Sequence, residues 1–170
     1  MTLRKIVSLP DPVLRRKARP VTEFGPELQT LVDDMIETMR LAPGVGLAAP
    51  QVGISDRLIV VEYPVDDEVE DSPRKLYVVV NPEITSMSED TISGIEGCLS
   101  LPGLQGEVDR ALAVTVKGRT RRNQPIKIKA KGWLARIFQH EIDHLEGVVF
   151  TDRATRVWKP APDEAVLDNV

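Results

Sequence analysis

Apolar residues recur every three or four positions between residues 26 and 41, which is the period of an α-helix with one buried face. Pro26 suits the first turn of such a helix, Glu27 complements its dipole, and Gly44 follows its end. The pattern predicts an amphipathic helix over 26–41 whose apolar face packs against the core. That face consists of Leu28, Leu31, Val32, Met35, Ile36 and Met39.

The middle of the chain has the alternation of β-strands. Leu112, Val114 and Val116 alternate with smaller or polar residues, which is typical of a strand with one buried face. A polar turn at 119–124 then leads to Ile126 and predicts a hairpin. The segments expected to form strands are Arg57–Tyr63, Leu76–Asn81, Glu83–Ile92, Ala111–Lys117 and Ile126–Ala130.

A second helix is predicted from Trp133 to about Glu146, and Gly147 is placed to end it. The chain shows neither an internal repeat nor a shift in composition that would mark a domain boundary. We therefore expect one α+β catalytic domain over residues 1–170. In it, antiparallel strands and hairpins pack around the second helix, and the N-terminal amphipathic helix joins them. Residues 152–170 are expected to form an irregular tail.

Composition narrows the class of protein. Hydrophobic residues make up 42% of the 170 residues, which is enough for a packed core and excludes wholesale disorder. The net charge of −4 gives no overall field that would attract nucleic acid. The single cysteine excludes an internal disulfide, and no apolar stretch suits a signal peptide or a membrane span. We expect a soluble, cytoplasmic protein.

Two local charge clusters depart from this balance. The acidic segment 66–71 is interpreted as a solvated loop rather than a metal site. The turn of the predicted hairpin is basic, with Lys117, Arg119, Arg121 and Arg122. It has no aromatic residue for base stacking, so a solvated turn is favoured, and contact with ribosomal RNA is the alternative.

The second helix carries the strongest chemical signal. His140 and His144 are the only two histidines, and their spacing places both imidazoles on one helix face. Glu141 lies roughly 100° further round, within reach of a water held by the histidines. This His-Glu-x-x-His arrangement is typical of a divalent metal bound by two neutral nitrogens, with a carboxylate as general base. The alternative is a pair of surface histidines.

A catalytic site of this kind needs a third protein ligand. Phe150 stands where the commonest such enzymes have a third histidine, and it cannot bind a metal. Acidic residues further along offer oxygen, and Cys98 offers the one thiol of the chain. A lone cysteine is more often a small buried apolar residue, but a thiolate is a good ligand for zinc or iron. Beside an incomplete two-histidine site, Cys98 is therefore favoured.

Three separated motifs resemble those of the peptide deformylases. The first is Gly44-Val45-Gly46-Leu47-Ala48-Ala49-Pro50-Gln51, the second is Glu96-Gly97-Cys98-Leu99-Ser100, and the third runs from Gln139 to Gly147. Each motif alone is a weak to moderate signal, whereas all three in this order and at these distances are highly specific. The resemblance also includes residues 11–15 and 135–136, and it covers most of residues 1–152.

The resemblance implies an enzyme that removes the formyl group from the N-terminal formyl-methionine of newly made peptides and releases formate. Cys98, His140 and His144 would bind one divalent metal, Fe²⁺ natively, with Zn²⁺, Ni²⁺ or Co²⁺ as alternatives. Metal-bound water would attack the formyl carbon with Glu141 as general base. The Gln51 side chain and the Leu99 N–H would donate hydrogen bonds to the developing oxyanion.

The peptide-binding residues follow partly from the resemblance and partly from helical spacing. By resemblance, the backbone of Gly46 meets the substrate. Arg136 and Ile137 precede His140 by one helical turn and Trp133 by two, which makes this stretch a candidate pocket wall. The alternative for Trp133 and Ile137 is a place in the ordinary core. The residues expected to bind the peptide are Val45, Gly46, Gly97, Trp133, Arg136 and Ile137.

Two features depart from the family pattern. Gln105 stands where many relatives have arginine, which bears on peptide affinity more than on chemistry. The tail lacks the long basic helix that some bacterial members present to the ribosome. The partners expected are formyl-methionyl nascent peptides and, transiently, the ribosome, without DNA or a membrane, and the protein is expected to be a monomer.

Two other functions compete with this interpretation. Another His-Glu-x-x-His metallohydrolase would cut internal peptide bonds, although Phe150 in place of a third histidine argues against it. A deformylase-like binding protein would hold a structural metal without turnover. Intact Glu141 and Gln51 favour an enzyme over that second alternative.

Overall fold

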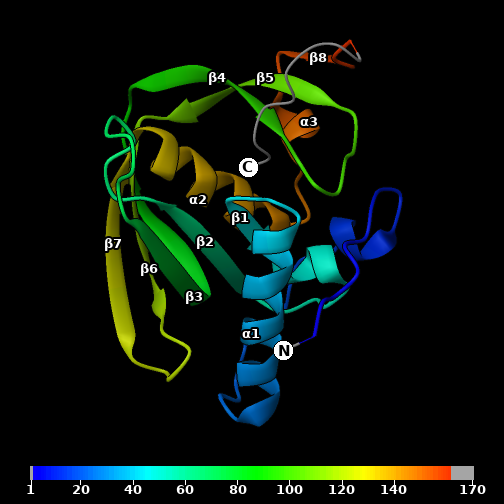
Figure 1. Cartoon of the computed structure of the whole chain (residues 1–170), viewed down its shortest axis with the longest axis vertical. Helices are drawn as coiled ribbons and strands as arrows, with labels where there is room; N and C mark the ends of the chain where they lie inside the picture. Colours follow the sequence, from blue (N-terminus) through cyan, green and yellow to red (C-terminus); the bar gives the residue numbers. More distant parts are fainter. Residues whose placement is uncertain (1, 162–170) are drawn as a thin grey trace.

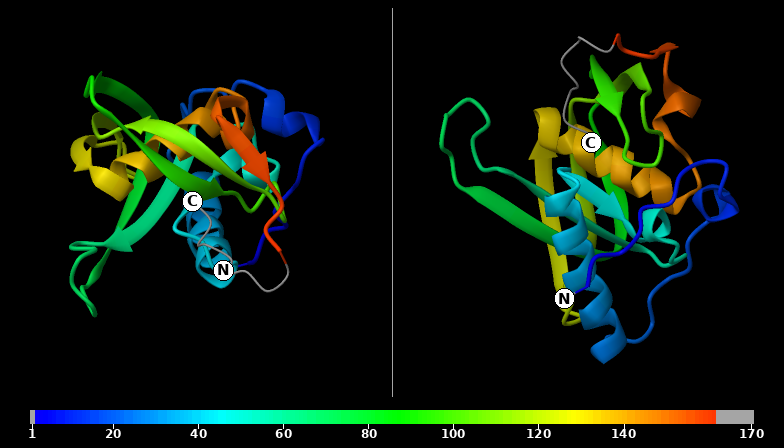
Figure 2. Two further views of the ribbon diagram at one scale, coloured as in Figure 1. Left: turned by 90° about the horizontal axis from the view of Figure 1, so that it is seen from above. Right: turned by 45° about the vertical axis from the view of Figure 1, so that its right-hand side comes forward.

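The computed structural model describes residues 2–161, and Figures 1 and 2 show how its elements are arranged. The helical elements are η1 (Pro12–Arg15), α1 (Pro26–Leu41), η2 (Ala49–Val52), α2 (Gly132–Leu145) and α3 (Phe150–Arg153), of which η1 and η2 are 3₁₀ turns. The strands are β1 (Gly46–Ala48), β2 (Leu58–Pro64), β3 (Arg74–Met87), β4 (Thr91–Gly97), β5 (Gln105–Ala111), β6 (Ala113–Arg119), β7 (Pro125–Lys131) and β8 (Arg156–Trp158).

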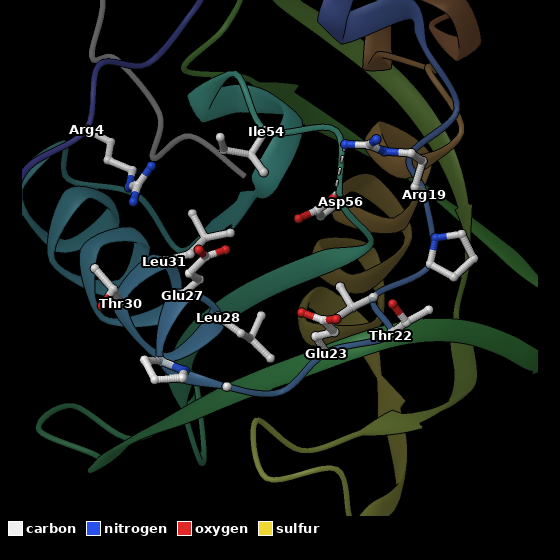
Figure 3. A pocket seen from close by; sticks show the side chains of 14 residues that line it. Arg4, Arg19, Thr22, Glu23, Glu27, Leu28, Thr30, Leu31, Ile54 and Asp56 are labelled. Carbon is white, nitrogen blue, oxygen red and sulfur yellow. Dashed lines mark ion pairs between the residues drawn. The ribbon is translucent and has the colours of Figure 1, made fainter.

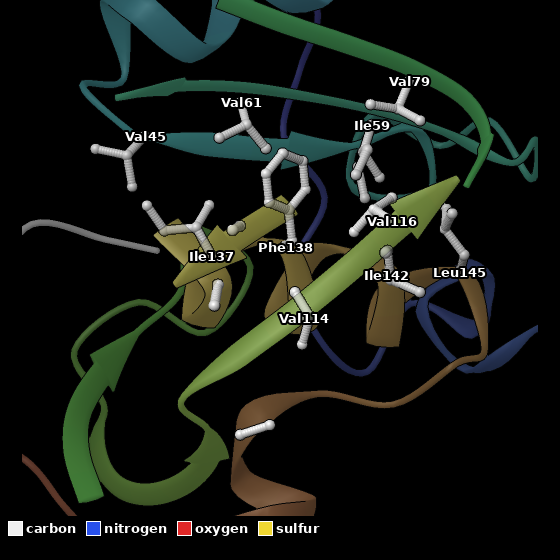
Figure 4. Packing of buried hydrophobic residues seen from close by; sticks show 14 of the residues in the cluster. Val45, Ile59, Val61, Val79, Val114, Val116, Ile137, Phe138, Ile142 and Leu145 are labelled. Carbon is white, nitrogen blue, oxygen red and sulfur yellow. The ribbon is translucent and has the colours of Figure 1, made fainter. Parts of the chain in front are cut away.

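A five-stranded antiparallel sheet, in the order β1-β2-β3-β6-β7, has a long helix against each face. In β2, Ile59 and Val61 belong to the cluster formed with α2, whereas Leu58 and Val60 belong to the cluster formed with α1. The apolar run of β2 follows from this, because a strand that is covered on both faces has no solvent-facing positions. Figure 4 shows Phe138 of α2 beside the strand residues of its cluster.

The amphipathic helix α1 has the predicted bounds, and its apolar face packs on the sheet as expected. Polar residues on its other side fasten the N-terminal segment. Asp34 accepts hydrogen bonds from the Thr2 N–H at 2.8 Å and from Arg4 Nε at 3.0 Å. Thr38 Oγ1 accepts one from the Arg4 N–H at 3.0 Å.

A smaller sheet, β4-β5-β8, lies on the other side of α2 from β1 and β2 (Figure 1). The apolar cluster of this sheet is small and includes Cys98, Val108 and Phe150. The junction of this sheet with α2 is largely ionic, because Arg110 of β5 bonds both to Glu96 of β4 and to Asp143 of α2. The second helix is thus enclosed between two sheets, as the α+β prediction required.

The predicted strands need correction in two places. β3 runs without a break from Arg74 to Met87, and a turn separates it from β4, so 83–92 is not one strand. The stretch 105–111 forms the unpredicted strand β5. Its sequence, Gln-Gly-Glu-Val-Asp-Arg-Ala, lacks apolar alternation because buried ion pairs replace apolar contacts in this strand. The apolar residues of this stretch therefore show neither the 3.6-residue period of a helix nor the two-residue period of a strand.

The tail expected from residue 152 is not irregular throughout. α3 extends to Arg153, and β8 pairs with β5, where Trp158 lies opposite Gln105. The rest of the predicted tail, residues 162–170, lies outside the described residues. None of the helices within residues 2–161 combines the length and the apolarity that crossing a membrane requires.

The two charge clusters adopt different structures. The acidic segment 66–71 forms a turn-rich loop between β2 and β3, as predicted, and Asp67 accepts a hydrogen bond from the Tyr63 hydroxyl at 2.8 Å. The basic turn between β6 and β7 is not simply solvated. Arg121 reaches α1, where it pairs with Asp33 at 2.8 Å and donates to Gln29 Oε1 at 2.7 Å.

Candidate metal centre

The helix α2 is buried around almost its whole circumference, which suits its place between the two sheets. It ends where Gly147 adopts a φ of 75°, a left-handed conformation that favours glycine. A methyl group on Gly147 would lie 2.6 Å from the backbone oxygen of Arg15, so this position also excludes a side chain. The predicted end of the helix is confirmed, with His140 and His144 one turn apart near its C-terminus.

The sequence motifs bring three metal-ligand side chains together. Cys98 lies in the turn directly after β4, and its Sγ is 3.4 Å from Nε2 of His144. The candidate ligand atoms of Cys98, His140 and His144 all lie within 4.8 Å of one another, and all three residues are buried. Donors sharing one tetrahedral ion lie roughly 3–4 Å apart, given metal–nitrogen and metal–sulfur bonds of about 2.1 and 2.3 Å. The three residues therefore fit a single small divalent ion.

Unpartnered polar atoms give a second test of this fit. His140 Nε2 and both carboxylate oxygens of Glu141 are buried without a hydrogen-bond partner in the described chain. Buried polar atoms nearly always have a partner, so a cluster of exceptions points to a ligand. The soft thiolate and the two imidazoles are a donor set that suits Fe²⁺ or Zn²⁺.

Glu96 orients the ring of His140, one of the three candidate ligands. Its Oε1 is 2.8 Å from Nδ1 of His140, which leaves Nε2 of that ring for the metal. Arg110 binds both carboxylate oxygens at 2.9 Å, and Arg136 Nη1 donates to Oε2 at 2.6 Å. Burial alone would raise the pKa of Glu96, but the hydrogen bonds from Arg110 and His140 outweigh it and lower that pKa. Glu96 is therefore an anion in the interior.

The Cys98 thiol depends on a cation for its ionisation. Burial, and next the charge of Glu141, raise the pKa of Cys98 to about 12, although the backbone N–H groups of Ser100 and Leu101 point at the sulfur and oppose this rise. A divalent ion beside the sulfur supplies the missing positive charge, since ligand thiols are deprotonated by the metal itself.

Glu141 faces the metal ligands from a fully buried position. Burial, and next the charge of Glu96, raise the pKa of Glu141 well above its ordinary value. Gly46 of β1 makes room for this side chain, because a methyl group there would lie 2.5 Å from Glu141 Oε2. The small residues of the first motif thus allow the β1 backbone to approach the candidate base.

Gln51 is held in one orientation beside the sulfur. Its Oε1 accepts a hydrogen bond from the Ala48 N–H at 3.0 Å, which turns the amide nitrogen towards the site. That nitrogen lies 3.2 Å from Ser100 Oγ and 3.5 Å from Cys98 Sγ. Leu99 follows Cys98 in the same turn.

The predicted pocket residues occupy different kinds of position. Trp133 is half-buried, and the guanidinium of Arg136 lies 5.3 Å from its ring centroid. Val45 and Ile137 both belong to the apolar cluster around α2 (Figure 4). Gly97 is buried and pairs with Gln105 across the β4–β5 ladder.

The structure does not place Arg136 or Ile137 on an open wall. Arg136 is 2% exposed, because Glu96 and the backbone oxygens of Ile92 and Val108 bind its guanidinium. Ile137 has no exposed surface. Helical spacing could not show that a second sheet covers that side of the helix.

Glu96 received no role from the sequence, although its motif was recognised. The available signal was an acidic residue between apolar and small neighbours, two positions before a ligand. In the structure Arg110 pairs with both Glu96 and Asp143.

A separate cleft of about 990 Å³ lies between α1 and the N-terminal segment (Figure 3). Cations and anions share its walls, with Arg4 and Arg19 near Glu23, Glu27 and Asp56. Arg19 and Asp56 are 3.8 Å apart, so part of this charge is already paired. None of the three metal-ligand residues lines the cleft, and its mixed walls favour no class of ligand.

The enclosed helix, with two histidines, a carboxylate and a nearby thiol, defines a metal-dependent hydrolase. A family model described as polypeptide deformylase matches residues 3–159. The chain belongs to the peptide deformylase family, whose members remove the formyl group from the N-terminal methionine of new peptides.

Relatives and solved structures agree with this assignment over nearly the whole chain. A peptide deformylase of Symbiobacterium thermophilum is 50% identical over 157 residues, which are 92% of this chain and 69% of the relative. The crystal structure of the Thermotoga maritima peptide deformylase has a TM-score of 0.83 and 40% identity, covering 92% of this chain and all of that one. A Met-Ala-Ser-bound class I type b peptide deformylase from Acinetobacter baumannii has a TM-score of 0.82 and 39% identity, covering 89% and 98%.

Proposed function

We propose that residues 1–170 act as one catalytic domain, in which Cys98, His140 and His144 bind the metal and Glu141 handles the proton. The observation that carries this proposal is that three buried side chains able to bind a metal lie close together, beside the buried carboxylate of Glu141. That carboxylate has no hydrogen-bond partner among residues 2–161. A bound divalent ion supplies an acidified water and a positive charge beside the scissile carbonyl.

Glu141 is the general base and acid of this proposal. Its raised pKa brings proton uptake closer to neutral pH, which is where a catalytic carboxylate is most effective. Glu141 takes a proton from the attacking water and passes it to the departing amine. The carbon–nitrogen bond of the formamide breaks. The products are formate and a peptide whose N-terminal methionine has a free amine.

Gln51 and Leu99 are the proposed oxyanion donors. The Gln51 amide is already oriented by its bond from Ala48, so its nitrogen can donate to the developing charge without turning the side chain, in place of its present contact with Ser100 or Cys98. The Leu99 N–H lies in the turn that carries Cys98, so a second donor comes from the same segment as a ligand.

The peptide is proposed to bind along the backbones of Gly46 and Gly97, with Val45 and Trp133 beside the methionine side chain. The relative from Acinetobacter baumannii, which was solved with Met-Ala-Ser bound, supports a short methionyl peptide as the ligand class. Arg136 and Ile137, which are enclosed here, support this wall from behind.

We further propose that the native ion is Fe²⁺, with Zn²⁺, Ni²⁺ or Co²⁺ able to replace it, since one thiolate and two imidazoles suit all four. We also propose a cytoplasmic monomer that contacts the ribosome transiently, because its substrates are newly made peptides.

The test is anaerobic turnover of formyl-Met-Ala-Ser by protein loaded separately with each of the four metals. Formyl-Met should exceed formyl-Gly peptides in kcat/KM by more than about tenfold, since the pocket must bury the methionine side chain. Cys98→Ser and His144→Ala should lose both metal and turnover.

Casein cleavage would instead indicate a peptidase, and bound metal without turnover would indicate a structural site. An equal half-life in air and under nitrogen would argue against iron.

A further inference from the structure

The hairpin β6–β7 carries an unusual share of the positive charge. Residues 113–131 contain seven of the 22 lysines and arginines and none of the 26 acidic residues. This segment therefore has a charge of +7, whereas the remaining residues together carry −11. Such asymmetry within one small chain is typical of a surface that meets a polyanion.

The register of the hairpin gathers most of these charges on one face of the sheet. Val114, Val116, Ile126, Ile128 and Ala130 pack towards α2, so alternate residues point the other way. Those outward cations form what we call the basic strip, and all of them are exposed. The basic strip consists of Lys117, Arg119, Lys127, Lys129 and Lys131.

The cations of the basic strip have no ion-pair partner among residues 2–161, whereas arginines elsewhere, such as Arg40 and Arg57, are paired. Lys117 lies directly opposite Lys127 in the ladder. Like charges in that position destabilise a sheet. Glu83 of β3 is in register with Lys117, yet no salt bridge joins them.

Protection of a sheet edge does not account for this arrangement. β7 is an edge strand, and lysines together with Pro125 do discourage pairing with another chain. Lys117 and Arg119, however, lie on β6, which is paired on both sides. Protection of the sheet edge would not require cations on an inner strand.

We infer that the basic strip binds the phosphate backbone of RNA. This inference deepens the proposed contact with the ribosome and rests on it. Along each strand the outward residues repeat about every 6.7 Å, and the strands lie about 4.8 Å apart, so the cations of the strip are closely spaced. The strip contains no aromatic residue on which bases would stack, so it meets phosphates without reading sequence.

The hairpin is rigid enough to present such a surface. Its turn is fastened to α1 by Arg121, which bonds to Asp33 and Gln29, and Gln29 Nε2 returns a hydrogen bond to the Arg121 oxygen at 2.8 Å. A preorganised surface loses less conformational entropy on binding. The basic strip also faces away from α2, so RNA on this face leaves the metal ligands accessible to a peptide.

The experiment compares two variants of the metal-loaded protein with equal loss of charge. The strip variant carries Lys117→Gln, Lys127→Gln and Lys129→Gln. The control variant carries Lys5→Gln, Arg16→Gln and Lys159→Gln, which change exposed cations outside the hairpin. Binding of a fluorescent 20-nucleotide RNA duplex is measured by anisotropy over a range of salt concentrations, and ribosome co-sedimentation and formyl-Met-Ala-Ser turnover are measured alongside.

We expect the strip variant to bind the duplex at least about tenfold more weakly, with a salt slope lower by about 2–3, since each lost phosphate contact removes just under one unit. It should also fail to sediment with ribosomes. The control variant should match the wild type in all three measurements, and the strip variant should keep full turnover.

Four results would overturn the inference. They are no duplex binding by the wild type, equal losses in both variants, displacement of RNA by polyglutamate at equal charge, or self-association of the strip variant with unchanged RNA affinity. Displacement by polyglutamate would indicate an acidic protein partner. Self-association of the strip variant would indicate that the cations protect the sheet edge from pairing. If the metal-loaded wild type did not hydrolyse formyl-Met-Ala-Ser, that result would count against the proposed function and not against RNA binding by the basic strip.

Discussion

Glu96 Oε1 lies 2.8 Å from Nδ1 of His140, and this one contact fixes both the orientation and the tautomer of a metal ligand. Glu96→Gln should therefore weaken metal binding by about 10–100-fold, the usual effect of removing such a support. Titration with a competing chelator measures the change. Glu83→Gln, at an exposed position on β3, is the matched control and should bind metal as the wild type does.

Glu141→Gln should retain the metal and lose almost all turnover. The carboxylate is not one of the three ligands, and its roles as base and acid are each worth roughly 10²–10⁴-fold. Metal content and kcat are measured on one preparation, and the acidic limb of the pH–rate profile should change shape. Full turnover by this variant would leave the helix as a metal site without this chemistry.

Gln51→Ala should lower kcat by about 10²–10³-fold, the cost of one preorganised oxyanion donor. Gln51→Glu should do no better, because a carboxylate repels the developing charge. Either variant should lower the pH–rate profile without moving it. Metal content decides the interpretation, since Gln51 also lies 3.5 Å from Cys98 Sγ. A wild-type kcat for Gln51→Ala would reduce this residue to a packing role.

Gly46→Ala should damage catalysis without removing the ligands. The added methyl would lie 2.5 Å from Glu141 Oε2 and 2.9 Å from its Cγ, and the buried side chain has no room to retreat. Displacing a catalytic group by about 1 Å costs on the order of 10²-fold in rate. Gly25→Ala is the control, since a methyl there meets nothing within 4 Å. Equal activity of the two variants would show that β1 can yield.

Asp34 should make stability depend on pH below about 4. Its hydrogen bond from the Thr2 N–H, followed by its contacts with Arg4, lowers its pKa below the ordinary value of 3.8. The unfolded chain therefore takes up the proton first as the pH falls. The stabilisation is complete above 3.8 and disappears as the pH drops through the folded pKa. The difference in Tm between the wild type and Asp34→Asn should thus be largest near pH 6 and should shrink as the pH falls below 3.8.

The sequence predicted α1, α2 and the histidine pair of α2 because each has a strong local signal. Helical period fixed Pro26–Leu41, and the spacing of His140 and His144 needed only helical geometry. Cys98 was reached by chemistry and resemblance, since no local pattern joins it to residues that lie 42 or more positions later. The strands β5 and β8 were missed because their pairing partners, and not their own residues, determine them.

The support around the site was less predictable for a physical reason. Arg136 was expected at a pocket wall, but a buried carboxylate in another element binds its guanidinium. Long-range ion pairs of this kind leave no period in a sequence, whereas apolar faces do. The same reason hid Glu96, whose partners Arg110 and His140 lie 14 and 44 residues away.

The ionic junction between the small sheet and α2 has a mechanical consequence. Apolar surfaces resist separation but allow packed elements to slide over one another, because their attraction has no direction. Hydrogen bonds to a carboxylate do have direction, and Glu96 accepts four, from Arg110 twice, Arg136 and His140. Any sliding of the small sheet along α2 would break the two that come from this helix, those of Arg136 and His140. One side chain therefore sets the distance between the strand that leads into Cys98 and the helix that carries His140 and His144.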